Sequence, residues 1–230
     1  MKVAAIVPAA GSGKRLGSKT PKPFVRLSGK PLLVHTLQSL KKSFTFSEII
    51  LAVHPRQMQS ARRLLARNRL GAVQVVAGGK TRSESVRNAA VSASKHSQWL
   101  LVHDAARPFL TQALVQRLLA AARRTGAAIC ALPATATVKK VKIKSLIVRG
   151  TLNREEIFLA QTPQVFRKKV LLDRYRRLGA GALRFTDEAA LFDGSGVDIK
   201  VVPGDAKNIK ITTRADKDLA EFYLKKRKGL

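Results

Sequence analysis

Residues 3–17, with the sequence VAAIVPAAGSGKRLG, decide the fold class of this chain. Val3–Val7 is a short run of apolar residues, which predicts a β-strand buried on both faces. A loop of small residues follows it, and the loop ends with two cations, Lys14 and Arg15. Small residues let backbone N–H groups approach an anion closely. This stretch therefore predicts the first strand of an α/β protein, with a candidate anion site where the strand ends.

The rest of the chain alternates between predicted strands and predicted helices. Further strands are expected at 49–53, 73–77, 99–102, 127–132, 199–202 and 209–211, and helices at 31–40, 57–70, 82–94, 112–125, 167–178, 187–192 and 214–226. Gly71, Gly126 and Gly179 follow three of these helices, where glycine is a favoured ending. Thr111 and Thr186 are expected N-caps. The alternation predicts a Rossmann-like α/β fold, with a largely parallel sheet and helices on both faces.

The alternation stops after Pro133. Residues 137–141 and 145–148 show strand-like alternation and little helical periodicity. No internal repeat and no linker rich in glycine and serine separates this region from the rest. We therefore predict a single domain over residues 1–230, with a β-rich excursion at about 134–164.

Composition excludes several classes of protein. The chain has 230 residues, 45% of them hydrophobic, which is typical of a globular protein. Cys130 is the only cysteine, so a disulfide framework is excluded. No apolar run approaches the roughly 18 residues that a membrane span needs, and the start lacks a signal-peptide pattern. We expect a cytoplasmic protein that does not bind a membrane.

The formal net charge is +30, from 44 Lys and Arg against 14 Asp and Glu. The basic residues occur in small groups on nearly every predicted helix, among them Arg62-Arg63, Arg123-Arg124, Arg167 to Lys169 and Arg174 to Arg177. This distribution favours a basic solvated surface over a specific nucleic-acid interface. A basic nucleic-acid-binding protein stays open as the alternative from another class. The excess charge would in either case attract phosphate anions.

Residues that follow the predicted strands are the candidates for a site, because doubly wound sheets bind ligands at the carboxyl ends of their strands. The loop after the first strand lacks the dinucleotide fingerprint, since Leu16 stands where its last glycine belongs. It also lacks the Walker A pattern, because Arg15 follows the lysine. Pro21 and Pro23 flank Lys22 and stiffen the backbone around it.

Two further loops add polar groups. Gly78-Gly79 precede a helix start, Thr81 to Ser85, which suits an anion or the polar edge of a ligand. Asp104 follows the strand at 99–102, where a carboxylate can hold a ribose hydroxyl or a metal ion.

Five blocks together resemble one family. They are Val7–Arg15 with Pro21-Lys22, His103–Pro108, Leu159–Gln164, Thr186–Glu188 and Asp205–Lys210. In this order and spacing they resemble the 2-C-methyl-D-erythritol 4-phosphate cytidylyltransferases, of the sugar-phosphate nucleotidyltransferase superfamily. The resemblance runs from the first predicted strand to the last predicted helix.

The resemblance implies an enzyme of non-mevalonate isoprenoid biosynthesis. Such an enzyme transfers CMP from CTP to methylerythritol 4-phosphate with Mg²⁺ and releases pyrophosphate. It also implies a homodimer, in which the β-rich excursion is the dimerisation arm. The implied catalytic residues are Arg15, Lys22, Arg154 and Lys210; the implied nucleotide-binding residues are Pro8, Ala9, Ala10, Gly11, Gly13, Gly78, Gly79, Ser85 and Asp104; and Arg107, Thr137, Thr162 and Thr186 would line the pocket for the sugar-alcohol phosphate. No protein ligand of the metal is assigned, apart from a part that Asp104 could play.

The implied reaction needs no general base. The second pKa of a phosphate monoester is about 6, so the attacking group is already a dianion at neutral pH. Fixed cations and a metal ion would then supply most of the catalysis by offsetting repulsion between two anions.

Three residues depart from the family pattern. Lys80, Ala136 and Asn153 stand where acidic residues are common. The missing carboxylate at Ala136 removes a contact to a substrate hydroxyl. A related family that forms CDP-ribitol on the same scaffold therefore stays open as an alternative.

Overall fold

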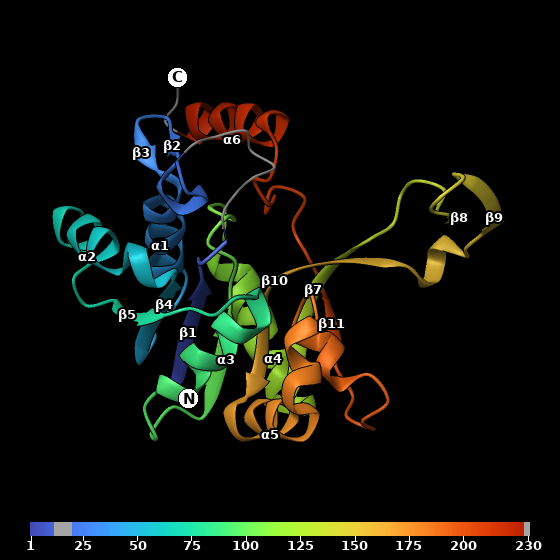
Figure 1. Cartoon of the computed structure of the whole chain (residues 1–230), viewed down its shortest axis with the longest axis horizontal. Coiled ribbons are helices and arrows are strands. Elements are labelled where there is room, and N and C mark those ends of the chain that lie inside the picture. Colours follow the sequence, from blue (N-terminus) through green and yellow to red (C-terminus); the bar gives the residue numbers. More distant parts are fainter. Residues whose placement is uncertain (12–19, 228–230) are drawn as a thin grey trace.

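The computed structural model describes residues 1–11 and 20–227. Gly13 and Arg15, two of the predicted site residues, lie outside the described residues. A seven-stranded sheet with the strand order β11-β7-β10-β6-β1-β4-β5 forms the centre of the molecule (Figure 1). Its strands are β1 (Val3–Pro8), β4 (Glu48–Val53), β5 (Gln74–Ala77), β6 (Trp99–Val102), β7 (Ala127–Pro133), β10 (Phe158–Arg167) and β11 (Lys200–Pro203).

The sheet is largely parallel, as predicted. β1 lies between β4 and β6 and is parallel to both. β4 and β5 are parallel, and so are β7 and β11. Only β10 is antiparallel to its neighbours, β6 and β7. The carboxyl ends of β1, β4, β5 and β6 therefore meet at one edge, where the sequence places its candidate loops.

Helices cover both faces of the sheet. They are α1 (Leu32–Ser43), α2 (Met58–Arg67), α3 (Arg82–Ser92), α4 (Gln112–Thr125), α5 (Lys168–Leu178) and α6 (Arg214–Arg227). Val3, Ala5 and Val7 of β1 pack into the core under α1, α2 and α4. Ala4 and Ile6 pack into the opposite core, under α3 and α5. Strand β1 is thus apolar at every position because both of its faces are buried, and the predicted fold class is confirmed.

Short elements complete the chain. They are β2 (Arg26–Leu27), β3 (Lys30–Pro31), β8 (Lys139–Lys142), β9 (Ile147–Thr151) and the 3-10 helices η2 (Lys22–Phe24), η3 (Pro55–Gln57), η4 (Arg154–Glu156), η5 (Gly179–Arg184) and η6 (Ala189–Phe192). Helix α6 packs over the edge of the sheet through Ala220, against Phe109 and Ile211.

The predicted ends of α4 are confirmed. Thr111 accepts a hydrogen bond from the Leu114 N–H at 3.4 Å, and Gly126 ends the helix with φ 87°. The ending predicted at Gly71 is wrong, because α2 ends at Arg67 and Arg69 is the residue with positive φ, 55°.

Two other local predictions are also wrong. Asp187 and not Thr186 begins the turn that leads into η6, because its carboxylate accepts a hydrogen bond from the Ala190 N–H at 3.2 Å. Residues 209–211 form no strand; the Ile211 N–H donates instead to the Ala106 carbonyl at 2.9 Å, in the loop after β6. Because of this hydrogen bond, residues 209–211 lie at the end of the sheet and do not pair with a strand.

The β-rich excursion is a hairpin of β8 and β9 that projects away from the rest of the molecule (Figure 1). The chain leaves the sheet after Pro133 and returns at Phe158, which is the register partner of Pro133. The return comes six residues before the predicted boundary at 164, because the first residues of β10 pair with β7. Among the described helices, none is long and apolar enough to cross a membrane.

Candidate active site

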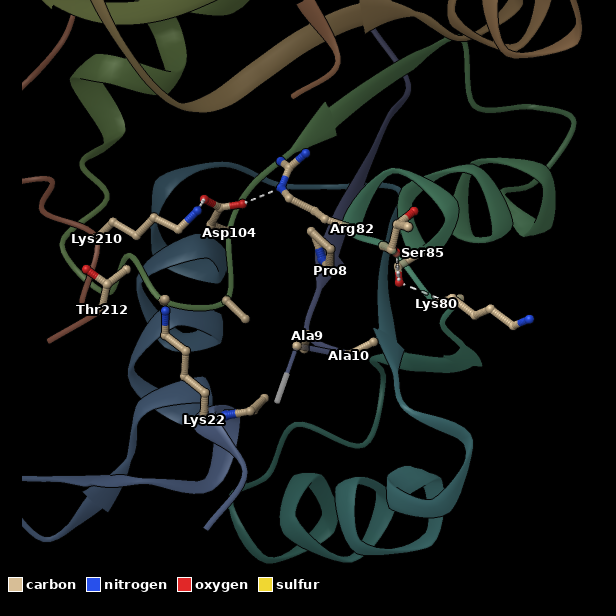
Figure 2. Close-up of a pocket in the computed structure, with 16 residues that line it drawn as sticks. Pro8, Ala9, Ala10, Lys22, Lys80, Arg82, Ser85, Asp104, Lys210 and Thr212 are labelled. Atoms are coloured by element: carbon tan, nitrogen blue, oxygen red, sulfur yellow. Dashed lines mark hydrogen bonds and ion pairs between the residues drawn. The ribbon is translucent and has the colours of Figure 1, made fainter. Parts of the chain in front are cut away.

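A pocket of about 330 Å³ lies at the carboxyl ends of β1 and β6 (Figure 2). It is lined by Pro8, Ala9, Ala10, Gly11, Lys22, Pro23, Gly79, Lys80, Thr81, Arg82, Ser85, Asp104, Ala105, Ala106, Lys210 and Thr212. These residues come from the loops after β1, β5, β6 and β11, and from the first turns of η2 and α3. The pocket thus gathers nine of the predicted site residues: Pro8, Ala9, Ala10, Gly11, Lys22, Gly79, Ser85, Asp104 and Lys210.

The glycine loop before α3 forms one wall of the pocket. The Ser85 hydroxyl accepts a hydrogen bond from the Gly79 N–H at 3.0 Å and donates to the Thr81 carbonyl at 2.9 Å. A side chain at Gly78 would place its Cβ 2.8 Å from the Cβ of Ala10, so only glycine lets the two loops meet. Gly78 is therefore buried behind the pocket surface, and Ser85 holds the loop in shape.

Asp104 is the centre of a buried ionic cluster. Its Oδ1 accepts a hydrogen bond from Arg82 Nε at 2.9 Å, and its Oδ2 lies 2.8 Å from Lys210 Nζ. Arg82 Nη1 donates to both carboxylate oxygens of Glu188 at 2.9 Å, and Glu188 is fully buried. Arg107 Nε lies 3.8 Å from Asp104 Oδ2. Two carboxylates and three cations thus form one cluster beside the pocket.

The cluster keeps Asp104 ionised. Burial disfavours its charge, but Arg82 and Lys210 outweigh burial and hold the pKa of Asp104 well below its ordinary value. For Arg82 burial also disfavours the charge, but Glu188 and Asp104 outweigh it and raise the pKa above its ordinary value. Arg82 is therefore charged at any working pH. The negative charge of Asp104 directs the Lys210 ammonium group to the pocket rim.

A hydrogen-bonded layer supports Asp104 from behind. The Asp104 N–H donates to Thr162 Oγ1 at 3.0 Å, and Thr162 Oγ1 lies 3.1 Å from His103 Nδ1. His103 Nε2 lies 2.9 Å from the Arg107 carbonyl, which can only accept, so Nε2 carries the proton and Thr162 donates to Nδ1. Burial is the largest influence on His103 and lowers its pKa to about 4, which keeps the ring neutral.

Arg107 and Thr162 belong to this layer and do not line the pocket. They are 8% and 4% exposed. Arg107 Nη1 donates to the Asn208 carbonyl at 2.7 Å, and Asn208 Nδ2 donates to the Thr162 carbonyl at 2.7 Å. These bonds fix the segment that carries Lys210. The predicted contact of both residues with substrate remains a prediction.

Lys22 lies on the same side of the pocket as Lys210 and extends toward Thr212 (Figure 2). It is the first residue of η2, and Pro23 behind it is buried. The N-cap residue, Pro21, is extended, with φ −56° and ψ 137°. The stiff backbone predicted from the two prolines is thus observed as a short 3-10 turn that directs a lysine into the pocket.

Three further predicted residues, besides Gly78, Arg107 and Thr162, do not line this pocket. Thr137 and Arg154 lie on the exposed excursion, and Thr186 is exposed before η6. Arg154 Nη1 donates to the Thr135 carbonyl at 3.2 Å, within the excursion itself.

Sequence reasoning also missed two residues of the site. The sequence places Arg82 only within the polar helix start Thr81 to Ser85, and Glu188 only within the block Thr186–Glu188. Their separation of 106 residues gives no sequence signal of pairing. The one signal for Arg82 was its place three residues after Gly79, at the start of α3.

The described residues contain no group of three or more histidine, cysteine or acidic side chains that could hold a metal ion. Asp104 is the only carboxylate among the described residues that line the pocket, and cations contact both of its oxygens. A metal ion here would therefore take most of its ligands from substrate phosphates and water, as Mg²⁺ commonly does.

The fold and the pocket define a class of protein, the α/β nucleotidyltransferases. A loop of small residues and a glycine loop meet at the carboxyl end of a parallel sheet, and Lys22 and Lys210 line the pocket beside them. Phosphate-bearing ligands bind at this place in such sheets, and no base–nucleophile pair lines the described pocket.

Comparisons with known proteins place the chain within this class. The family model described as 2-C-methyl-D-erythritol 4-phosphate cytidylyltransferase matches residues 3–226, and the chain belongs to this family. A protein of that name from Syntrophus aciditrophicus is 41% identical over 230 residues, which cover 99% of this chain and 98% of its own length. One from Solibacter usitatus is 40% identical over 235 residues, covering 98% and 96%.

A solved structure agrees with these relatives. The crystal structure of 4-diphosphocytidyl-2C-methyl-D-erythritol synthase from Anaerococcus prevotii superposes with a TM-score of 0.84 at 31% identity. It covers 97% of this chain, and this chain covers 96% of it. The family predicted from the five sequence blocks is thus confirmed.

Proposed function

We propose that this chain transfers CMP from CTP to 2-C-methyl-D-erythritol 4-phosphate, forming CDP-methylerythritol and pyrophosphate for isoprenoid biosynthesis. The observation that carries the proposal is the convergence of Lys22 and Lys210 on a pocket walled by the small-residue and glycine loops. Family membership supports the acceptor. Neither ribitol phosphate as acceptor nor nucleic-acid binding is favoured by these relatives.

The reaction is one displacement at phosphorus. A phosphate oxygen of the acceptor forms a bond to the α-phosphorus of CTP while the bond to the bridging α–β oxygen breaks, and that oxygen leaves with pyrophosphate. The acceptor is a dianion at neutral pH, so no proton has to be removed. The residues must instead offset the repulsion between two anions, and this is where fixed cations act.

Each part of the pocket then has a role in this step. We assign the loop from Pro8 to Gly11 and the loop at Gly79 to holding the nucleotide, with Asp104 on the ribose side. Lys22 and Lys210 face the reacting phosphates and stabilise the charge of the transition state. Asp104 fixes the position of Lys210 through the 2.8 Å ion pair. Arg15 is assigned the same task as Lys22, from the family resemblance.

We propose Mg²⁺ as the metal, bound to the triphosphate of CTP and to water. It would supply charge neutralisation on the phosphates. The protein contributes the surrounding cations, because Asp104 is already paired with Arg82 and Lys210.

We also propose that two copies pair through the excursion, which we call the arm, residues 134–157. Exposed apolar side chains gather on it: Val141, Ile143, Leu146, Ile147, Val148 and Leu152 are 41–85% exposed. An exposed apolar patch of this kind marks an interaction site. Thr137 and Arg154 would then complete the acceptor pocket of the second copy. We also propose that the enzyme is cytoplasmic.

A product assay tests the activity. The protein is incubated with CTP and Mg²⁺ and with either methylerythritol 4-phosphate or ribitol 5-phosphate, and the products are identified by mass spectrometry. We expect CDP-methylerythritol, and ATP or GTP should not replace CTP. CDP-ribitol as the main product would overturn the acceptor assignment, and no nucleotidyl transfer to either acceptor would overturn the activity.

A further inference from the structure

A second cavity, of about 800 Å³, lies at the other end of the sheet from the candidate active site. Its lining includes Met1, just before β1, and Trp99, the first residue of β6. The candidate active site is lined instead by Pro8 at the end of β1 and by Asp104 after β6. Six extended residues span about 20 Å, so the two cavities are separate sites.

The lining of this cavity is strongly cationic. It comprises Met1, Lys95, Ser97, Gln98, Trp99, Arg123, Arg167, Lys168, Lys169, Leu172 and Arg176. Lysine and arginine make up six of these eleven residues, against 44 of 230 in the whole chain. No acidic residue is among the lining residues described. We call this cavity the distal cationic cavity.

Three separate segments bring these cations together. Lys95 follows α3, Arg123 lies in the last turn of α4, and Arg167 to Lys169 join β10 to α5. Two of the groups are held in place. The Arg167 guanidinium lies 5.1 Å from the centroid of the Trp99 ring, and Lys168 Nζ donates to the Ala93 carbonyl at 2.6 Å. The cavity thus presents cations on a partly fixed frame.

The charge of this cavity is not balanced within the described part of the chain. Asp173 lies 3.5 Å from Arg176, but Lys95, Arg123 and Lys169 form no ion pair with a described residue. Crowded like charges destabilise a folded protein unless a counter-charge is present. The first turn of α5 also holds cations, where the helix dipole favours anions. Cations that lack a counter-charge and lie at the unfavourable end of a helix are typical of a functional position.

We propose that the distal cationic cavity binds a small anion with two or more phosphate groups. Arginine and lysine bind phosphate through charge-assisted hydrogen bonds, and six of them exceed what one phosphate can use. The volume lies in the range of small-molecule sites. Trp99, the only aromatic residue of the lining, is 7% exposed and lies under Arg167. The ligand is therefore recognised through its phosphates and not through a stacked base.

Calorimetric titration with inorganic tripolyphosphate, without metal ion or other substrate, tests the proposal. The test variant is Arg123→Gln/Lys169→Gln, and the control is Arg62→Gln/Arg63→Gln on the exposed face of α2. Both variants lose two positive charges, and all four residues are exposed, so both should fold. We expect the wild type and the control to bind one more tripolyphosphate than the test variant, or the test variant to bind it about tenfold more weakly.

Two results would overturn the proposal. One is an equal effect of both variants, which would mean that net charge alone attracts the anion. The other is binding of a single-stranded oligonucleotide, but not of tripolyphosphate, at the residues of the test variant. Melting temperature with and without tripolyphosphate gives a second readout, in which tripolyphosphate should raise the melting temperature of the test variant less than that of the wild type and the control. Because no CTP or acceptor is used, failure of the proposed activity leaves this outcome unchanged.

Discussion

The predicted site has two parts, one around Asp104 at the end of the sheet and one on the arm. The two parts differ in how far their charged groups are buried and in whether these groups have partners within the chain. Around Asp104 the carboxylates are buried and the cations are buried or half-buried, and they are paired with residues of the same chain. On the arm, Arg154 is exposed among apolar side chains that are themselves exposed. A buried charge needs its partner within the fold, whereas an exposed apolar hairpin needs a partner from outside. The difference agrees with our proposal that the first part is preformed in one chain and that the second is completed by another copy.

The largest effect is expected from breaking the buried cluster. Glu188→Ala leaves Arg82 buried with one partner fewer, and loss of one member of a buried pair costs about 3–5 kcal/mol. Glu156→Ala, on the exposed arm, should change the free energy of unfolding by less than about 0.5 kcal/mol. Urea denaturation of both variants measures the contrast. Equal losses of stability would contradict the assignment of Glu188 to a buried pair.

A slightly smaller effect is expected on catalysis from Lys22→Ala. Removing one fixed cation from the transition state should lower kcat by about 100- to 1,000-fold, or about 2.7–4 kcal/mol, with little change in unfolding. Lys41→Ala, on the exposed end of α1, is the matched control and should keep full activity. Steady-state assays of pyrophosphate release measure both. Near-normal turnover of Lys22→Ala would remove the lysine from the mechanism.

The layer behind Asp104 should respond to pH. The pKa of His103 is about 4 in the folded chain against 6.5 unfolded, so the unfolded chain binds more protons as pH falls. The neutral His103 ring contributes fully to the free energy of unfolding above pH 6.5. As the pH falls from 6.5 to 4, this contribution is lost and the free energy of unfolding decreases by up to about 3 kcal/mol. Urea denaturation at several pH values should show this loss in the wild type. His103→Gln should reduce the pH dependence and His96→Gln, at an exposed position, should not.

The smallest expected effect tests the arm. Arg154→Ala should lower kcat/KM by about 10- to 100-fold, because it removes a cation from the acceptor side only. Arg149→Ala, on the same hairpin, is the control and should be close to wild type. Mixing Arg154→Ala with Lys22→Ala should restore part of the activity, since a mixed dimer would contain one intact site. No recovery after verified subunit exchange would show that the site is not shared.

Several features followed from local sequence. Strand β1 was predictable because five consecutive apolar residues suit only a strand buried on both faces. Helix α4 was predictable because Thr111 and Gly126 satisfy its ends locally. The two prolines beside Lys22 predicted a stiff backbone at that position. The place of the glycine loop directly after a strand predicted that this loop lies at the carboxyl end of the sheet.

For other features the local sequence signal was misleading. Gly71 was favoured as a helix end, but the helix stops earlier, at Arg67, and Arg69 takes the positive φ. Thr186 was favoured as a cap, but Asp187 takes that hydrogen bond. In both cases a neighbouring residue took the position that the sequence pattern assigned to another.

By itself, the sequence determined the α/β class, the order of strands and helices along the chain, and the family to which the chain belongs. These depend on periodicity, caps and short motifs, which act over a few neighbouring residues. Only the tertiary structure decided that Arg82 joins Asp104 to Glu188, that Arg107 and Thr162 lie beneath the pocket, and that cations from three segments surround a second cavity. These contacts join residues far apart in the chain, and a charge gains its partner only when the sheet brings strand ends together.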